Sequence, residues 1–234
     1  NGAISNDGQL SALGGTGVNQ GGRGGAVSAG MFGSRKSGGH GSVLFSNSID
    51  VSGGNGLIGG EGGTVLMTLN QSAAVGAEII LLGYNRIEAN GATGAPGGSG
   101  GTITFSQVPE SKLPASGPAG AVINTVDLSA NAGDATGSNS DSPNGGQGGL
   151  IQLTTQEIVG VQTATWEFLR NSGALWAKGA SGLNGGAGGR LNLRGRVSAE
   201  TSGRLDVHGG AGTAVGGGAG GSIYVAGAEG RLVI

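Results

Sequence analysis

The chain has 234 residues and a formal net charge of −2, with 57 glycines but only 5 prolines and no cysteine. So little proline excludes a collagen triple helix, and the absence of cysteine excludes disulfides and thiolate metal sites. The near-neutral charge provides no long-range attraction to nucleic acid. No run of about 18 apolar residues is present, so we expect no membrane-spanning helix.

A glycine-rich phrase followed by a short strand-like run recurs along the chain. In chain order the copies are GGRGGAVSA (from Gly21), GGHGSVLFS (from Gly38), GGEGGTVLM (from Gly59), GGSGGTITF (from Gly97), GGQGGLIQL (from Gly145), GGAGGRLNL (from Gly185) and GGAGGSIYV (from Gly217). After the glycines, apolar and polar residues mostly alternate, which is typical of a β-strand. Each copy therefore predicts a glycine-rich arc that leads into a strand.

A second strand-like phrase precedes most of these copies. It reads IDVSGG (from Ile49), IEANGA (from Ile87), VDLSAN (from Val126), LWAKGA (from Leu175) and LDVHGG (from Leu205). Because a unit this small cannot bury its own apolar face, successive units must stack as coils. Stacking predicts two apolar columns: Ile49, Ile87, Val126, Leu175 and Leu205 in one, and Val65, Ile103, Ile151, Leu191 and Ile223 in the other.

These patterns predict an all-β fold, a right-handed parallel β-helix (β-solenoid) with strands about 4.8 Å apart. Glycine suits the arcs, because a side chain there would strike the next coil or require a forbidden φ angle. The arcs are either tight turns or extended segments like polyglycine II, with three residues per turn. We predict one domain over residues 1–234 with an irregular insertion around residues 154–177, and we expect Phe45, Phe105 and Phe168 in the core.

Residues that could carry chemistry are few. The acids Asp50, Glu88, Asp127 and Asp206 are expected in one outward column, and paired acids can cleave polysaccharides, although solvated acids on an outward face are ordinary. We expect that the chain is not an enzyme. His40 and His208 lack a second ligand at metal-binding spacing, so we expect no metal and no cofactor. Aromatic rings stack on sugars, which makes Trp166, Trp176 and Tyr224 candidate sugar contacts.

The G-G-x-G-G phrase resembles that of glycine-rich bacterial secreted proteins, and Asn1–Gly15 (NGAISNDGQLSALGG) is similar to repeats of filamentous-haemagglutinin-type adhesins. The resemblance implies an extracellular or cell-surface protein with a structural or adhesive role. Read tail to head, GRLVI and NGAIS form an unbroken repeat, so we expect either end-to-end self-association or a longer parent chain. The alternative is an extracellular carbohydrate-binding or polysaccharide-degrading β-helix. We expect partners to be the chain itself or surface carbohydrate, with no nucleic acid and no membrane span.

Overall fold

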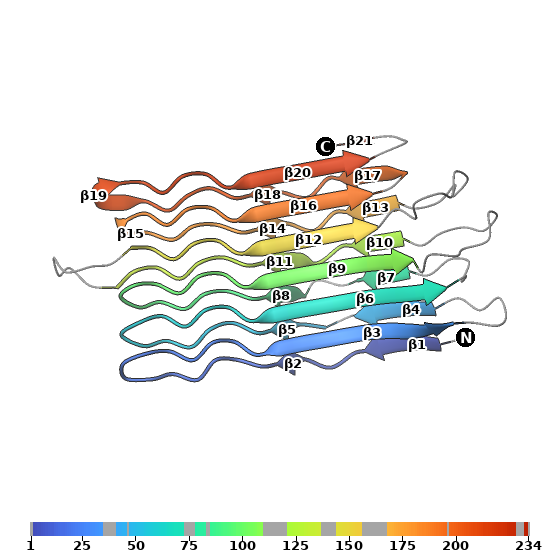
Figure 1. The fold of residues 1–234 in the computed structure, drawn as a ribbon, viewed down its shortest axis with the longest axis horizontal. Coiled ribbons are helices and arrows are strands. Elements are labelled where there is room, and N and C mark those ends of the chain that lie inside the picture. The colour runs from blue at the N-terminus through green and yellow to red at the C-terminus, as the bar shows by residue number, and fades with distance from the viewer. Residues whose placement is uncertain are drawn as a thin grey trace.

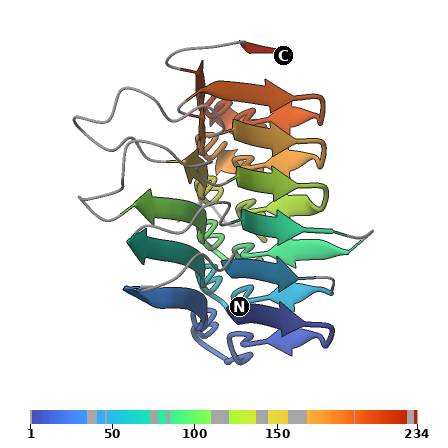
Figure 2. The ribbon, with the colours of Figure 1, turned by 90° about the vertical axis from the view of Figure 1, so that its right-hand side faces the viewer.

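The computed structural model describes residues 2–34, 41–45, 47–72, 78–82, 85–109, 121–136, 144–155, 168–195, 197–227 and 232–233. Within these ranges every regular element is a β-strand, and the strands form stacked coils (Figure 1). Followed upward from the N-terminus, the chain runs to the right along the front and returns behind, which makes the coil right-handed (Figures 1 and 2). The predicted parallel β-solenoid is therefore confirmed.

Each coil contributes one strand to each of three parallel sheets. Sheet A contains β1 (Gly2–Asn6), β4 (Gly41–Phe45), β7 (Glu78–Leu81), β10 (Ala121–Asn124), β13 (Phe168–Asn171), β17 (Ser198–Thr201) and β21 (Leu232–Val233). Sheet B contains β2 (Leu10–Ser11), β5 (Ile49–Asp50), β8 (Arg86–Glu88), β11 (Asp127–Ser129), β14 (Leu175–Trp176) and β18 (Leu205–Asp206). Sheet C contains β3 (Ala26–Ser34), β6 (Thr64–Ser72), β9 (Thr102–Pro109), β12 (Leu150–Thr155), β16 (Arg190–Gly195) and β20 (Ser222–Gly227).

Alternating residues of the three sheets point inward and make one continuous apolar core. The predicted column on sheet C is confirmed, because strand register joins Val65, Ile103, Ile151, Leu191 and Ile223. Phe45 and Phe105 are buried as predicted, whereas Phe168 is only half-buried. Stacking buries residues of the inner coils completely, which is the main favourable term in folding.

The predicted column on sheet B is wrong at one position. Leu128, not Val126, is in register with Ile87 and Leu175. Val126 is also buried, but it lies at the corner before β11. A shift of two residues leaves every side chain on the same face of a strand, so apolar alternation alone could not reveal the error.

Between sheets B and C each coil extends a glycine-rich arm, with an outgoing limb and a returning limb that lie side by side (Figure 1). In the returning limb that begins at Gly59, Gly59 and Gly62 donate to carbonyls of the next coil, at 2.9 Å each. Gly60 and Gly63 instead donate to the outgoing limb of their own coil, at 2.9 and 2.7 Å. Hydrogen bonds that change direction with a period of three residues are the mark of polyglycine II packing, so the arms are not tight turns.

This period explains the phrase G-G-x-G-G. In the inner coils, four of its five positions face another limb, where a side chain has no room. A Cβ atom on Gly148 would lie 2.3 Å from the carbonyl oxygen of Ala177 and 2.4 Å from the amide nitrogen of Gly189. The middle position is not restricted in this way: Gln147 is exposed to solvent, and the other copies carry Arg, Glu, Ser or Ala there. At the ends of the two last arms, β15 (Gly182–Asn184) and β19 (Gly212–Gly216) form a small sheet of their own.

Amide groups that face away from the neighbouring limbs find a second kind of partner. The backbone N–H of Asn131 donates to Oδ1 of Asn90 in the preceding coil, and that of Lys178 donates to Oδ1 of Asn131, both at 2.9 Å. Asparagine in this outward column of the outgoing limb therefore ties successive coils together and satisfies a donor that polyglycine II leaves open.

Two sequence predictions concern segments that are only partly described. The phrase at Gly38 leads into β4 of sheet A rather than into an arm and a strand of sheet C. Of the stretch predicted as an insertion, residues 156–167 lie outside the described residues. Its two flanks are regular: Thr154 and Thr155 end β12, and residues 168–177 pass through β13 and β14.

Candidate functional site

The structure does not bring the four predicted acids into one column. On the outward face of sheet B the column reads Ser11, Asp50, Glu88, Ser129, Trp176 and Asp206. Asp127 pairs instead with Arg86, because the register of β11 is shifted as described above. Only Asp50 and Glu88 are direct neighbours, so the predicted row of stacked acids is wrong.

Three of these acids hold the backbone or a cation. Asp50 accepts a hydrogen bond from the N–H of Ser52 at 3.0 Å, and Asp127 accepts one from the N–H of Ala174 in the next coil at 3.0 Å. Glu88 lies 3.2 Å from the guanidinium group of Arg86. Each carboxylate therefore has a stabilising role within or between coils.

Asp206 is the centre of the densest group of charges in the described residues. Its side chain is only 9% exposed and lies 2.6 Å from Nδ1 of His208, 2.8 Å from Arg204 and 3.5 Å from Nζ of Lys178. Burial alone would raise the pKa of Asp206, but the hydrogen bonds and charge of His208, with the charge of Lys178, outweigh it and lower the pKa to about 2. Asp206 is thus ionised at neutral pH and holds no proton that it could donate to a glycosidic oxygen.

The low pKa of Asp206 makes stability depend on pH. Because the folded pKa is about 2 and the unfolded value is 3.8, the stabilisation is fully present above pH 3.8 and is lost as the pH falls toward 2. We expect a loss of about 2 kcal/mol in the free energy of unfolding over that window. Urea unfolding of the wild type and of Asp206→Asn at each pH measures it. The two pH profiles should differ by this step, and parallel profiles would contradict the prediction.

Trp176 lies beside the same group of charges. The Arg86 guanidinium, two coils below, is 5.6 Å from the centre of its ring, and Nζ of Lys178 is 5.9 Å away. Both distances are in the range of cation–π interactions. The half-buried ring therefore lies between Arg86 and Lys178. Ser129, in the coil between those of Trp176 and Arg86, is small enough to let the Arg86 side chain reach the ring.

The three predicted sugar contacts do not form one site among the described residues. Trp176 belongs to sheet B, whereas Tyr224 is 55% exposed on the outer face of sheet C. Trp166 lies outside the described residues. A role of each ring in sugar binding stays a prediction, and Trp176 and Tyr224 belong to different sheets.

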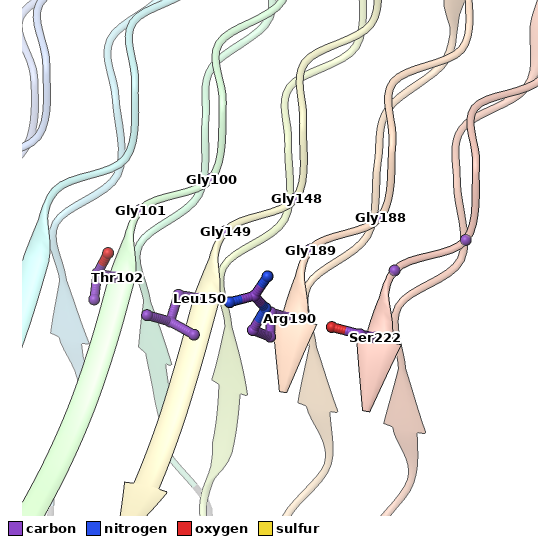
Figure 3. A pocket seen from close by; sticks show the side chains of 12 residues that line it. Gly100, Gly101, Thr102, Gly148, Gly149, Leu150, Gly188, Gly189, Arg190 and Ser222 are labelled. Carbon is purple, nitrogen blue, oxygen red and sulfur yellow. The ribbon is translucent and has the colours of Figure 1, made fainter. Parts of the chain in front are cut away.

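A shallow groove of about 590 Å³ crosses the coils where the returning limbs enter sheet C (Figure 3). Its floor consists of glycine pairs such as Gly148–Gly149, and its rim consists of Thr102, Leu150, Arg190 and Ser222. The packing of the limbs already requires these glycines, so the groove is a consequence of the fold. Its rim combines a hydroxyl, an alkyl group, a cation and another hydroxyl, which points to no single class of ligand.

The remaining candidates are dispersed as well. His208 is held by Asp206, and His40 lies outside the described residues. No group of three or more His, Asp and Glu side chains that could hold a metal ion occurs in the described part of the chain. No helix among the described residues is long and apolar enough to cross a membrane.

No protein-family model, curated protein or solved structure matches this chain. The predicted resemblance to bacterial surface proteins is therefore supported in its β-solenoid architecture alone.

Sequence reasoning missed a polar column inside the solenoid. Asn124 and Asn171 are fully buried at the corner between sheets A and B, and Nδ2 of Asn124 donates to Oδ1 of Asn171 at 2.7 Å. The sequence does carry a signal for this column, because the strands AVIN and FLRN both end in Asn. It was hidden because Phe45 and Leu81 occupy the same column in earlier coils.

Proposed function

We propose that this chain is a structural or adhesive β-solenoid of the extracellular space or cell surface, a segment or subunit of a fibre whose parts stack end to end. The supporting observation is that, among the described residues, part of the apolar column is exposed at the last coil. Leu191 of β16 is fully buried, whereas Ile223, the next residue in the same column, is 45% exposed. A hollow of about 490 Å³ there is lined by Thr201, Ser202, Gly203, Leu205, Ile223 and Val225.

The geometry of this end defines which strands a partner would extend. β21 already occupies the position above β17, whereas β18 and β20 are the last strands of sheets B and C in the described residues. A strand edge with unpaired backbone groups readily pairs with another chain. Docked strands above β18 and β20 would bury Leu205, Ile223 and Val225 as the inner coils bury their equivalents.

Adjacent residues of β20 provide a matched pair of variants to test end-to-end stacking. Ile223 belongs to the inward column, and Tyr224 is on the outer face. We expect particles of the wild type to lengthen with concentration in electron microscopy and light scattering. Ile223→Lys should weaken association at least about tenfold, and Tyr224→Lys should leave it unchanged. Monomers at every concentration, or equal effects of the two variants, would overturn the proposal.

A further inference from the structure

The sequence contains several Asn-Gly pairs, and the structure treats one of them differently from the rest. In the described ranges these pairs begin at Asn55, Asn90, Asn144 and Asn184. In such a pair the amide nitrogen of the glycine can act as a nucleophile, because glycine has no side chain to hinder it. That nitrogen can attack the side-chain carbonyl carbon of the preceding asparagine. The reaction requires a nitrogen that is free of other hydrogen bonds.

Three of the four glycine amides are held in the arms. Gly91 donates to the carbonyl of Asn131 at 2.8 Å, Gly145 to that of Asn184 at 2.9 Å, and Gly185 to that of Gly216 at 3.0 Å. Each of these bonds joins one coil to the next. Attack by any of these nitrogens would require a local opening of the stack, which is rare in the interior of a cooperative structure.

Gly56 is the exception. Among the described residues, its N–H donates no hydrogen bond, although the equivalent position in the next coil, Gly94, donates to Asp134. Asn55 and Gly56 lie close to the end of the arm, where the limb turns back, and Asn55 is exposed. The leaving amide of Asn55 is therefore accessible to water, and Gly56 is half-buried beside it.

A neighbouring hydroxyl is placed to assist. Oγ1 of Thr93, in the next coil, donates to Oδ1 of Asn55 at 3.1 Å. When nitrogen attacks the amide carbon, negative charge develops on that oxygen, and a donor already aimed at it stabilises the tetrahedral intermediate. Asn90 also has donors at its Oδ1, from Ser129 at 2.7 Å and Asn131 at 2.9 Å, but the nitrogen of Gly91 is tied. Asn55 alone among the four combines a hydroxyl donor with an untied nitrogen.

We propose that Asn55 is a site of self-catalysed deamidation. The Gly56 nitrogen bonds to Cγ of Asn55, and its proton passes through water to the side-chain amide nitrogen. The bond between Cγ and that nitrogen then breaks, and ammonia leaves. Water then opens the resulting succinimide at either carbonyl to give aspartate or isoaspartate. The product places a carboxylate at the end of an arm, beside Leu57, which is 64% exposed. An apolar surface thereby gains a negative charge with time and without an enzyme.

The test follows each Asn-Gly peptide by mass spectrometry after the intact chain is kept in mildly alkaline buffer. We expect deamidation at Asn55 to be at least about tenfold faster than at Asn90, Asn144 and Asn184. In denaturant the four rates should converge, because the hydrogen bonds that protect the other three are lost. A folded-state rate at Asn55 no higher than at the other three would overturn the proposal.

Two variants of Thr93 test the assisting hydroxyl. Thr93 is exposed, so we expect both to fold with the circular dichroism of the wild type. Thr93→Val removes the donor and should slow deamidation at Asn55 several-fold, while Thr93→Ser keeps the donor and should preserve the rate. An unchanged rate in Thr93→Val would overturn the role assigned to Thr93.

Discussion

Replacing Gly148 with alanine is expected to lower the free energy of unfolding by about 4 kcal/mol, above the usual cost of overpacking. The added Cβ would lie 2.3 Å from the carbonyl oxygen of Ala177 and 2.4 Å from the amide nitrogen of Gly189. Both contacts are with backbone, which cannot rotate away as a side chain can. The limbs must separate, and the hydrogen bond from Gly148 to Ala187 at 2.9 Å would be lost with them.

The control for this substitution is the preceding residue. Gln147 occupies the middle of the same G-G-x-G-G phrase and is exposed, so Gln147→Ala should change stability by no more than about 0.5 kcal/mol. Urea unfolding measures both variants, and hydrogen exchange should show lost protection in the arms next to Gly148, because each coil of a solenoid contacts only its neighbours. Equal effects of the two variants would contradict polyglycine II packing of the arms.

Much of this fold could be predicted from the sequence, because apolar alternation reports which side of a strand faces the core. The column from Val65 to Ile223 was predicted correctly for this reason. Exact register was beyond the same signal: Val126 and Leu128 are both apolar and both inward, and only the paired strands distinguish them. The direction of a hydrogen bond leaves no trace in composition, so tight turns and polyglycine II could not be separated until partners were known.

The candidate sites were predicted less well, for a related reason. Function depends on which side chains meet across coils, and irregular coil lengths conceal this. Register offsets between successive strands of sheet A range from 30 residues, between Phe168 and Ser198, to 47, between Ala121 and Phe168. Trp176 and Arg86 are far apart in the sequence, yet their side chains meet, because only one coil of the stack separates the strands that carry them. Outward residues also alternate among acids, serine and tryptophan, so no ladder marks them as a group.

Replacing Asn171 with alanine is expected to cost about 3 kcal/mol, because Asn171 is the centre of the buried polar column. Its Nδ2 donates to the carbonyl of Gly173 at 2.9 Å and to the hydroxyl of Thr201 at 3.1 Å, and its Oδ1 accepts from Asn124. Truncation leaves these buried groups short of partners and opens a cavity. Chemical unfolding with intact folding checked by circular dichroism measures the loss.

The same column indicates how the loss can be reduced. In earlier coils Phe45 and Leu81 fill this position and are buried without any polar partner. Replacing both asparagines, as Asn124→Leu with Asn171→Leu, removes donor and acceptor together and fills the space, so it should cost less than Asn171→Ala alone. Such a result would show that removing one asparagine lowers stability mainly because its hydrogen-bond partners are left unpaired. The intact pair of asparagines would then stabilise the fold only weakly. A double variant less stable than Asn171→Ala would instead mean that their bonds to the corner carbonyls of Val126 and Gly173 are required at these two coils.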